Sequence, residues 1–223
     1  LYGWAGLQDR DSTSAALYRI PTNADNVPAI YPDGFLPLIN PDVTDLTAAA
    51  GTNGRIGGWD ADFSLVYGRN KLDYAVRNSL NATYGADSPT SFDAGGLVYD
   101  QFVLNAGLSR ALELGLANPV NFAWGVEARR ENYEINAGEP ASWDTGTVNP
   151  ARTPGSQGFP GFQPSNEIDK DRSAFGGYVD VETNLTDKLL ASLALRAEHY
   201  SDFGSATTGK VALRYDFAPQ FAL

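Results

Sequence analysis

The chain has 223 residues, 43% of them hydrophobic and 12% aromatic, and its 16 Lys and Arg against 27 Asp and Glu give a formal net charge of −11. This acidic balance excludes a nucleic-acid partner, because binding to phosphates needs an excess of Lys and Arg. With no Cys and one His, the sequence also excludes disulfide bonds, thiolate metal sites, a cysteine nucleophile and a multi-histidine metal centre.

The predicted elements are β-strands, because apolar and polar residues alternate along most of the chain. Successive side chains of a strand point to opposite faces, so each predicted strand has one apolar and one polar face. No run of about 18 apolar residues is present, and no membrane-spanning helix is expected. In chain order, strands are expected at 1–8, 43–50, 59–68, 101–116, 121–129, 175–185, 189–198 and 210–217.

The connections between these strands alternate in length. The short ones contain the Gly, Asn, Asp or Pro that tight turns require. Long connections on one side of a sheet and short ones on the other are typical of outer-membrane β-barrels. Short turns are expected at 51–58, 117–119, 186–188 and 218–220, and long polar connections at 9–42, 70–96 and 136–172, whereas the connection at 201–206, on the side of the long ones, is short.

The two faces of the predicted sheet differ in the environment they need. The polar face carries charges such as Glu127, Asp180, Arg196 and Arg214, which cannot form a dry core. We therefore predict an all-β fold, an antiparallel up-and-down sheet of about eight long strands that forms a segment of a large transmembrane β-barrel. A soluble β-sandwich, whose strands also alternate, stays as the alternative. Aromatic residues near strand ends on the apolar face are placed as in an interfacial girdle: Trp59, Tyr67, Phe122, Trp124, Tyr215 and Phe217.

Several segments, taken in order, resemble the β-barrel domain of TonB-dependent outer-membrane receptors. Those in connections resemble its extracellular loops, and two near the end of the chain resemble its mid-barrel strands. The resemblance covers essentially the whole chain, so we interpret residues 1–223 as one partial barrel domain. The segments are 26–39, 78–81, 88–92, 129–133, 155–162, 174–185 and 198–204.

The resemblance implies a barrel of about 22 strands that is closed by an N-terminal plug domain. It implies import of scarce ligands, such as siderophores, vitamin B12 or oligosaccharides, across the outer membrane of a Gram-negative bacterium. The energy would come from the TonB protein, which contacts an N-terminal region absent here. The expected partners are therefore the lipid bilayer, the missing plug, the remaining barrel strands and an unidentified small molecule. Because its strand edges are unpaired, the isolated fragment is expected to self-associate or to need detergent.

Aromatic residues in the long connections are the candidates for ligand binding. Aromatic faces suit sugars and flat ligands, and loops of this length are often functional. Packing of the loops against one another is the alternative role for the same rings. The candidates are Tyr31, Phe35, Trp143, Phe159 and Phe162.

No catalytic residue, cofactor or resident metal is predicted. His199 and Ser201 share a strand face and Asp202 points the other way, which does not suit a catalytic triad. The Gly-rich segment 51–58 lies between two strands, whereas a phosphate loop precedes a helix. The acidic clusters at 9–11 and 167–171 are expected to be solvated loops, with calcium binding left open.

The sequence thus predicts a fragment of an energy-coupled uptake receptor, a transporter and not an enzyme. A self-contained eight-stranded outer-membrane barrel with a structural or adhesion role is one alternative. A soluble β-sandwich binding domain is the other.

Overall fold

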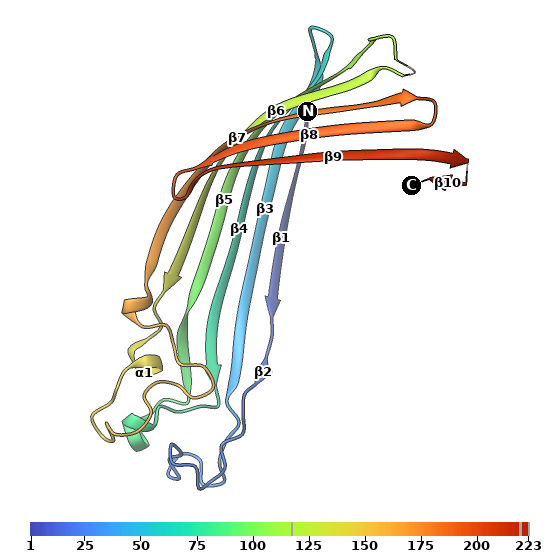
Figure 1. Ribbon diagram of the computed structural model, residues 1–223. Coiled ribbons are helices and arrows are strands. Elements are labelled where there is room, and N and C mark those ends of the chain that lie inside the picture. Colours follow the sequence, from blue (N-terminus) through green and yellow to red (C-terminus); the bar gives the residue numbers. More distant parts are fainter. Residues whose placement is uncertain (117, 219, 223) are drawn as a thin grey trace.

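The computed structural model describes residues 1–116, 118–218 and 220–222. Most of them form a single antiparallel sheet whose strands are neighbours in chain order (Figure 1), which confirms the predicted all-β, up-and-down architecture. The long strands are β1 (Tyr2–Asp11), β3 (Leu38–Ile56), β4 (Trp59–Arg77), β5 (Ser91–Leu112), β6 (Val120–Asn136), β7 (Ile168–Thr186), β8 (Leu189–Tyr200) and β9 (Gly204–Ala218), and the short ones are β2 (Ser14–Ala15) and β10 (Phe221–Ala222).

The connections hold little regular structure. They contain α1 (Pro140–Trp143) and two 3-10 segments, Ala82–Asp87 and Pro164–Asn166. None of the helices in the described residues is long and apolar enough to cross a membrane.

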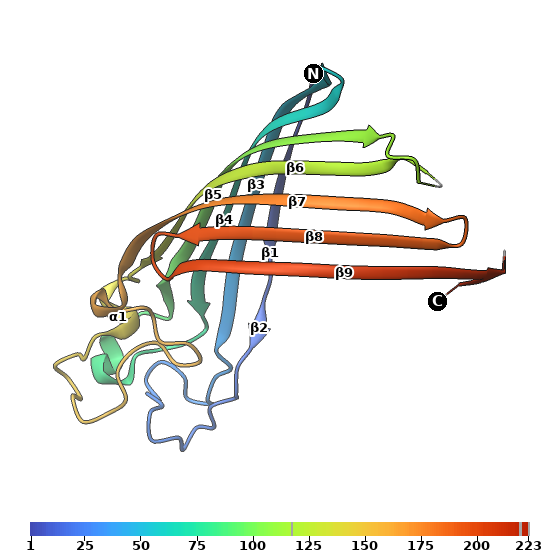
Figure 2. The same ribbon diagram turned by 45° about the horizontal axis from the view of Figure 1, so that its top comes forward.

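The sheet is curved and open. β1 lies at one edge and β10 at the other, and β6 to β9 fan away from β1 to β5 (Figure 2). A barrel that stands alone needs its first and last strands to pair, and a sandwich needs a second sheet packed on the first. Neither arrangement occurs among the described residues, so the sheet is a segment of a barrel wall.

The strands extend further than predicted on the side of the long connections. β3 begins at Leu38, β4 runs to Arg77 and β7 begins at Ile168. A strand of about 9–11 residues crosses the hydrocarbon core of a bilayer, whereas β3 to β6 have 17 to 22 residues. Their ends therefore project beyond the membrane, where both faces meet water and the alternation that reveals a strand is lost.

The turns on the opposite side differ from the prediction in both directions. β3 continues to Ile56, and Gly57 and Gly58 alone reverse the chain, with φ of 59° and 83°. Positive φ at both central residues matches the twist of a two-residue hairpin and suits Gly. β5 ends at Leu112 rather than at 116. Residues 117 and 219, which belong to the predicted turns 117–119 and 218–220, lie outside the described residues.

The strand register separates two faces as predicted. The outer face carries apolar cross-strand partners such as Trp124, Val179 and Leu195, and the inner face carries Glu127 and Arg196. The apolar side chains of the outer face have no second layer over them, and Leu104 and Leu193 are 52% and 45% exposed. An apolar surface of this extent requires an apolar partner, which lipid supplies.

Aromatic side chains lie on the outer face in two places along the strands. Near the tight turns, Trp59 and Phe122 meet edge to face with ring centroids 5.9 Å apart, and Tyr215 and Phe217 lie 4.8 Å apart. Tyr67 lies opposite Phe102 midway along β4 and β5, because these strands run further towards the long loops than predicted. Two such bands on one apolar face have the arrangement of an interfacial girdle.

A tyrosine packed over a glycine fixes the register of neighbouring strands on the inner face. A Cβ on Gly125 would lie 2.6 Å from Cε1 of Tyr178 and 2.7 Å from the carbonyl oxygen of Ala106. Tyr2 covers Gly51 in the same way, since a Cβ there would lie 2.3 Å from the Tyr2 ring. Aromatic rings over glycines are one of the devices that set register in curved sheets.

Replacing Gly125 by Ala should therefore weaken the wall. The added methyl forces Tyr178 or the backbone to shift, at a cost of about 1–3 kcal/mol. Gly177→Ala is the matched control on the next strand, because its Cβ would meet its nearest atoms at 3.6 and 4.0 Å. Urea unfolding of the receptor in detergent, followed by the gel shift of the folded barrel, should show a lower midpoint for Gly125→Ala only. Equal midpoints for the two variants would contradict this role of the pair.

Candidate functional site

Ion pairs line the inner face. Arg172 on β7 lies 2.7 Å from Oε2 of Glu131 on β6, and the Tyr99 hydroxyl donates to the other carboxylate oxygen at 2.5 Å. The Arg172 guanidinium also lies 5.5 Å from the centre of the Tyr200 ring. The Glu131 side chain is only 7% exposed, and a buried carboxylate of this kind needs such partners.

A second group of charges lies nearer the middle of the same wall. Nη2 of Arg196 on β8 lies 2.7 Å from Glu198 and 3.1 Å from Glu127. Arg129 is 3.8 Å from each of these two carboxylates. The inner face is thus a polar surface whose charges compensate one another, as expected of a wall that faces a wet or plugged interior.

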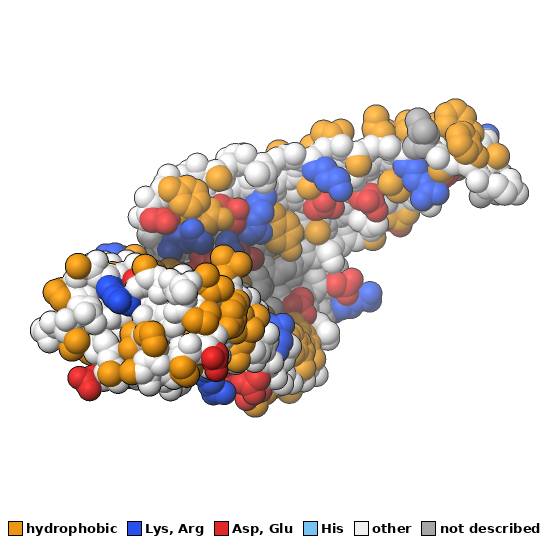
Figure 3. Space-filling view, turned by 90° about the horizontal axis from the view of Figure 1, so that it is seen from below, with side chains coloured by type: hydrophobic (Ala, Val, Ile, Leu, Met, Phe, Trp, Pro, Cys, Tyr) orange, Lys and Arg blue, Asp and Glu red, His pale blue; other side chains and the backbone are white. Residues whose placement is uncertain are grey.

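The three long connections pack together at one end of the sheet. We call residues 16–37, 78–90 and 137–167 the loop cluster. Its apolar core joins Val27 and Phe35 of the first loop to Leu80 and Ala82 of the second. Figure 3, which looks onto this end, shows further apolar side chains gathered over part of its surface.

The third loop is anchored on the ends of two strands. Val76 of β4 and Phe92 of β5 form a second buried group, against which Phe159 packs. The Phe159 ring also lies 4.8 Å from the ring of Tyr74. Val76 and Tyr74 share the inner face of β4, so the loop cluster covers the inner face at the mouth of the wall.

Two buried amide side chains connect the loops to one another. Nδ2 of Asn81 donates to the carbonyl oxygens of Ala141 and Asp144, at 2.9 Å each. Gln157 accepts from Nε of Arg19 at 2.8 Å and donates to the carbonyl of Asp25 at 2.7 Å. The Gln157 carbonyl accepts from the hydroxyl of Ser79 at 2.8 Å, so that one residue bridges all three loops.

The five predicted aromatic residues all lie in the loop cluster, in different surroundings. The Phe35 ring is 3% exposed and stacks on Tyr31 with centroids 4.6 Å apart. The Tyr31 hydroxyl donates to the Ser79 carbonyl at 3.3 Å, and burial raises the pKa of this phenol above its usual value. Phe35 therefore packs the loops together. Contact of these rings with a ligand stays a prediction.

The other three rings are half-buried. Phe159 and Phe162 meet edge to face at 5.7 Å, and Nε1 of Trp143 donates to the Gly138 carbonyl at 3.0 Å. Sequence reasoning missed Asn81 and Gln157 as joints, because their partners lie up to 138 residues away along the chain and no local pattern marks them.

The residues set aside in the sequence do not form a reaction centre. His199 pairs with Ser205 at 3.0 Å on the outer face, whereas Asp202 lies 3.8 Å from Arg172. In the acidic segment 167–171, Asp171 pairs with Arg130 and Asp169 accepts from Asn132. Within residues 1–116, 118–218 and 220–222, no group of three or more acidic or His side chains is arranged to hold a metal ion.

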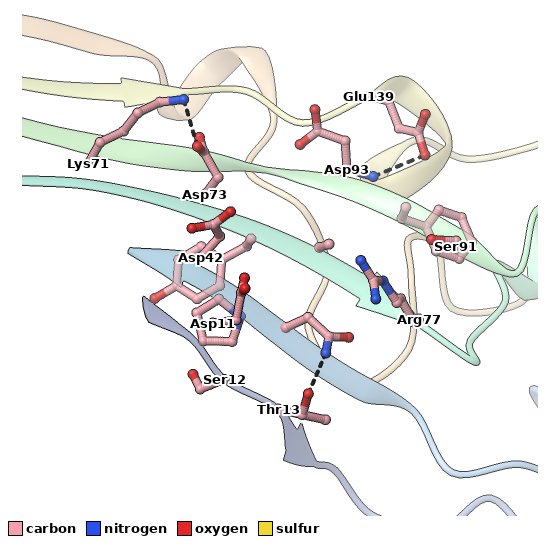
Figure 4. A pocket seen from close by; sticks show the side chains of 15 residues that line it. Asp11, Ser12, Thr13, Asp42, Lys71, Asp73, Arg77, Ser91, Asp93 and Glu139 are labelled. Carbon is pink, nitrogen blue, oxygen red and sulfur yellow. Dashed lines mark hydrogen bonds and ion pairs between the residues drawn. The ribbon is translucent and has the colours of Figure 1, made fainter. Parts of the chain in front are cut away.

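A polar hollow marks where the outer face leaves the membrane. It has a volume of about 840 Å³, and its charged lining includes Asp42, Asp73 and Arg77. Figure 4 shows Lys71 against Asp73, at 2.6 Å, and Glu139 reaching the backbone of Asp93. Asp42, Asp73 and Arg77 lie on the outer face, on the long-loop side of Tyr67. Side chains in contact with lipid would be apolar, so this part of the outer face lies outside the hydrocarbon core. The border of the lipid-facing zone therefore lies near the aromatic girdle, with the loop cluster outside it.

The family comparison agrees with this geometry. The family model described as TonB dependent receptor-like, beta-barrel, matches residues 1–223. The chain belongs to this family. No curated protein matched the chain, and no solved structure matched it.

Membership in the TonB-dependent receptor family identifies the environment of each face of the sheet. The family consists of outer-membrane receptors and transporters, not enzymes. The apolar outer face and the girdle are features of its membrane-embedded β-barrel, and the charged inner face is the side away from lipid.

Replacing Asn81 by Ala should loosen the loop cluster without unfolding the wall. The change leaves two buried carbonyls and the Thr83 hydroxyl without the partner they have now, at a cost of about 1–3 kcal/mol for each group left unpaired. Limited proteolysis of the receptor should then cut the three loops faster, while the barrel keeps its gel shift. Thr147→Ala, at an exposed position of the same cluster, should leave the cleavage rate unchanged. Unchanged cleavage of the Asn81 variant would show that the joint is dispensable.

Proposed function

We propose that this chain forms part of the wall and mouth of a receptor that imports a scarce small molecule across a Gram-negative outer membrane. The observation that carries the proposal is the combination of an apolar outer face suited to lipid, a charged inner face and three loops that pack together over the mouth. Siderophores, vitamins and oligosaccharides are the ligand classes. Energy reaches the receptor through TonB and the receptor's N-terminal region.

The wall charges support contact with a plug domain. Glu127 and Glu198 each carry one charge and share Arg196 at 3.1 and 2.7 Å. A half-buried group of this kind can exchange partners with a polar domain that fills the interior, whereas an apolar wall would leave the polar groups of that domain without partners. We therefore assign the middle of the inner face to the plug and the mouth to the ligand.

The loop cluster supports the role in ligand recognition. Its loops are already joined by buried side chains, so a ligand does not have to order them, and this lowers the entropic cost of binding. Half-buried rings such as Trp143, Phe159 and Phe162 offer flat faces for sugars or ring systems. Deletion of the receptor gene should abolish uptake of one compound in a panel of ferric siderophores, cobalamin and oligosaccharides, and normal uptake of every compound would contradict the proposal.

Trp143→Ala should lower uptake of that compound and leave the loops resistant to protease. Loss of a central aromatic contact costs about 1–2 kcal/mol of binding, and Trp143→Tyr should recover part of it because a flat ring remains. Phe35→Ala is the comparison, since emptying a buried site costs about 3–5 kcal/mol. That variant should lose both uptake and protease resistance. Normal uptake by the Trp143 variant would remove this ring from ligand recognition.

Leu193→Asp should lower the amount of receptor inserted in the outer membrane. A charge that faces hydrocarbon costs about 2–4 kcal/mol for a basic residue at the midplane and less for Asp. Leu190→Asp is the matched control, because it makes the same change on the inner face of β8, opposite Asn184 and Arg214. Outer-membrane fractions probed by immunoblot should show a loss for the Leu193 variant only. Equal insertion of both variants would overturn the assignment of this face to lipid.

A further inference from the structure

A row of small side chains crosses the outer face of β6 to β9. Val126, Gly177, Ala197 and Thr207 are direct cross-strand partners in this row. The next row towards the tight turns is bulky, and it contains Trp124, Val179 and Leu195 before it reaches Gly209. On the side towards the long loops, Phe175 and His199 are the larger neighbours. A trough therefore runs across the strands between two raised rows.

This trough is a real hollow in the lipid-facing surface. Its volume is about 710 Å³, and Trp59 and Phe122 line it on the tight-turn side. Its floor exists because Gly177 has no side chain. A Cβ there would meet its nearest atoms at 3.6 and 4.0 Å, so packing does not demand glycine at this position. The contrast with Gly125, whose Cβ would clash, shows that the trough is not a by-product of close packing.

The side chains of the trough favour an apolar ligand. Those that point outward are apolar apart from Thr207, so they offer no charge to an ion and few hydrogen bonds to a sugar. The trough is continuous with the face that contacts lipid, and a bilayer presents acyl chains to that face at high concentration. Thr207 lines one end of the trough, and the His199–Ser205 pair, at 3.0 Å, lies in the adjoining row towards the long loops.

We propose that the trough binds one acyl chain of an outer-membrane lipid, with the polar end of that lipid beside Thr207 and the His199–Ser205 pair. Strands of such barrels tilt by about 35–45°, so a row perpendicular to the strands is oblique to the membrane normal and spans part of the depth of the bilayer. The bound lipid would then fill a depression between strands that no side chain fills. The proposal rests on the lipid-facing assignment of the outer face.

The test counts lipids held by the receptor. The full-length receptor that carries this wall is purified in detergent, mixed with palmitoyl-oleoyl-phosphatidylglycerol and examined by native mass spectrometry. Gly177→Leu fills the trough and should lose one tightly retained lipid relative to the unchanged receptor. Ala197→Leu should do the same from the neighbouring strand. Ala50→Leu adds the same side chain to the outer face of β3, far along the sheet, and should keep the lipid count.

The outcomes separate this proposal from the assignment of the face. Equal lipid counts in the unchanged receptor, Gly177→Leu and Ala197→Leu, with all of them inserted, would overturn the proposal and leave the lipid-facing assignment intact. An equal loss in Ala50→Leu would also overturn it, because retention would then not depend on the trough. A change of oligomeric state in Gly177→Leu without loss of lipid would assign the trough to a second copy of the receptor instead. Normal insertion of Leu193→Asp would remove the premise itself.

Discussion

The structure depends on one constraint, which is that backbone groups in a membrane must be hydrogen-bonded to other backbone groups. An uninterrupted ladder satisfies them, and it also fixes the face to which every side chain points. The apolar outer face is one consequence. The other is that charges on the inner face must find partners across strands, because the sheet is a single layer. The ion pairs of Glu131 with Arg172 and of Arg196 with Glu127 are such partners.

A wall made of a single sheet has almost no hydrophobic core of its own, and most of the well-buried residues lie in or next to the loop cluster. Leu80, Asn81 and Thr83 of the loop cluster have no exposed surface, and Val76 of the wall is equally buried in the second apolar group, against which Phe159 packs. Apolar packing and amide hydrogen bonds therefore stabilise the mouth, whereas lipid and the ladder stabilise the wall. The two parts can respond to different changes in sequence, so the surface proposed to bind ligand can vary while insertion in the membrane is kept.

The sequence predicts the wall better than the mouth, for a physical reason. Inside the membrane one face of the sheet contacts lipid and the other contacts a polar interior. Apolar and polar residues therefore alternate along 59–68 and 189–198, and this alternation predicts the strands. Beyond the girdle both faces meet water, so the projecting end of β4, up to Arg77, was read as loop. In the loops, aromatic composition points to segments that lie in the loop cluster, but composition alone does not separate the buried Phe35 from the half-buried Trp143. Partners such as Gln157 and Arg19 are set by the fold as a whole.

The attachment of the third loop constrains how the mouth can work. Phe159 packs on Tyr74 and near Val76 of β4, and the backbone of Phe162 donates to the carbonyl of Ala94 on β5. Moving this loop away from the mouth would expose these apolar contacts and break hydrogen bonds at Asn81 and Gln157. Because the loops were ordered during folding, a ligand gains little by ordering them further. If the proposed role in ligand recognition holds, discrimination between ligands depends on fit to a surface that already exists. Movement of a single loop costs more than movement of the three loops together, because a single loop has to leave its contacts with the other two.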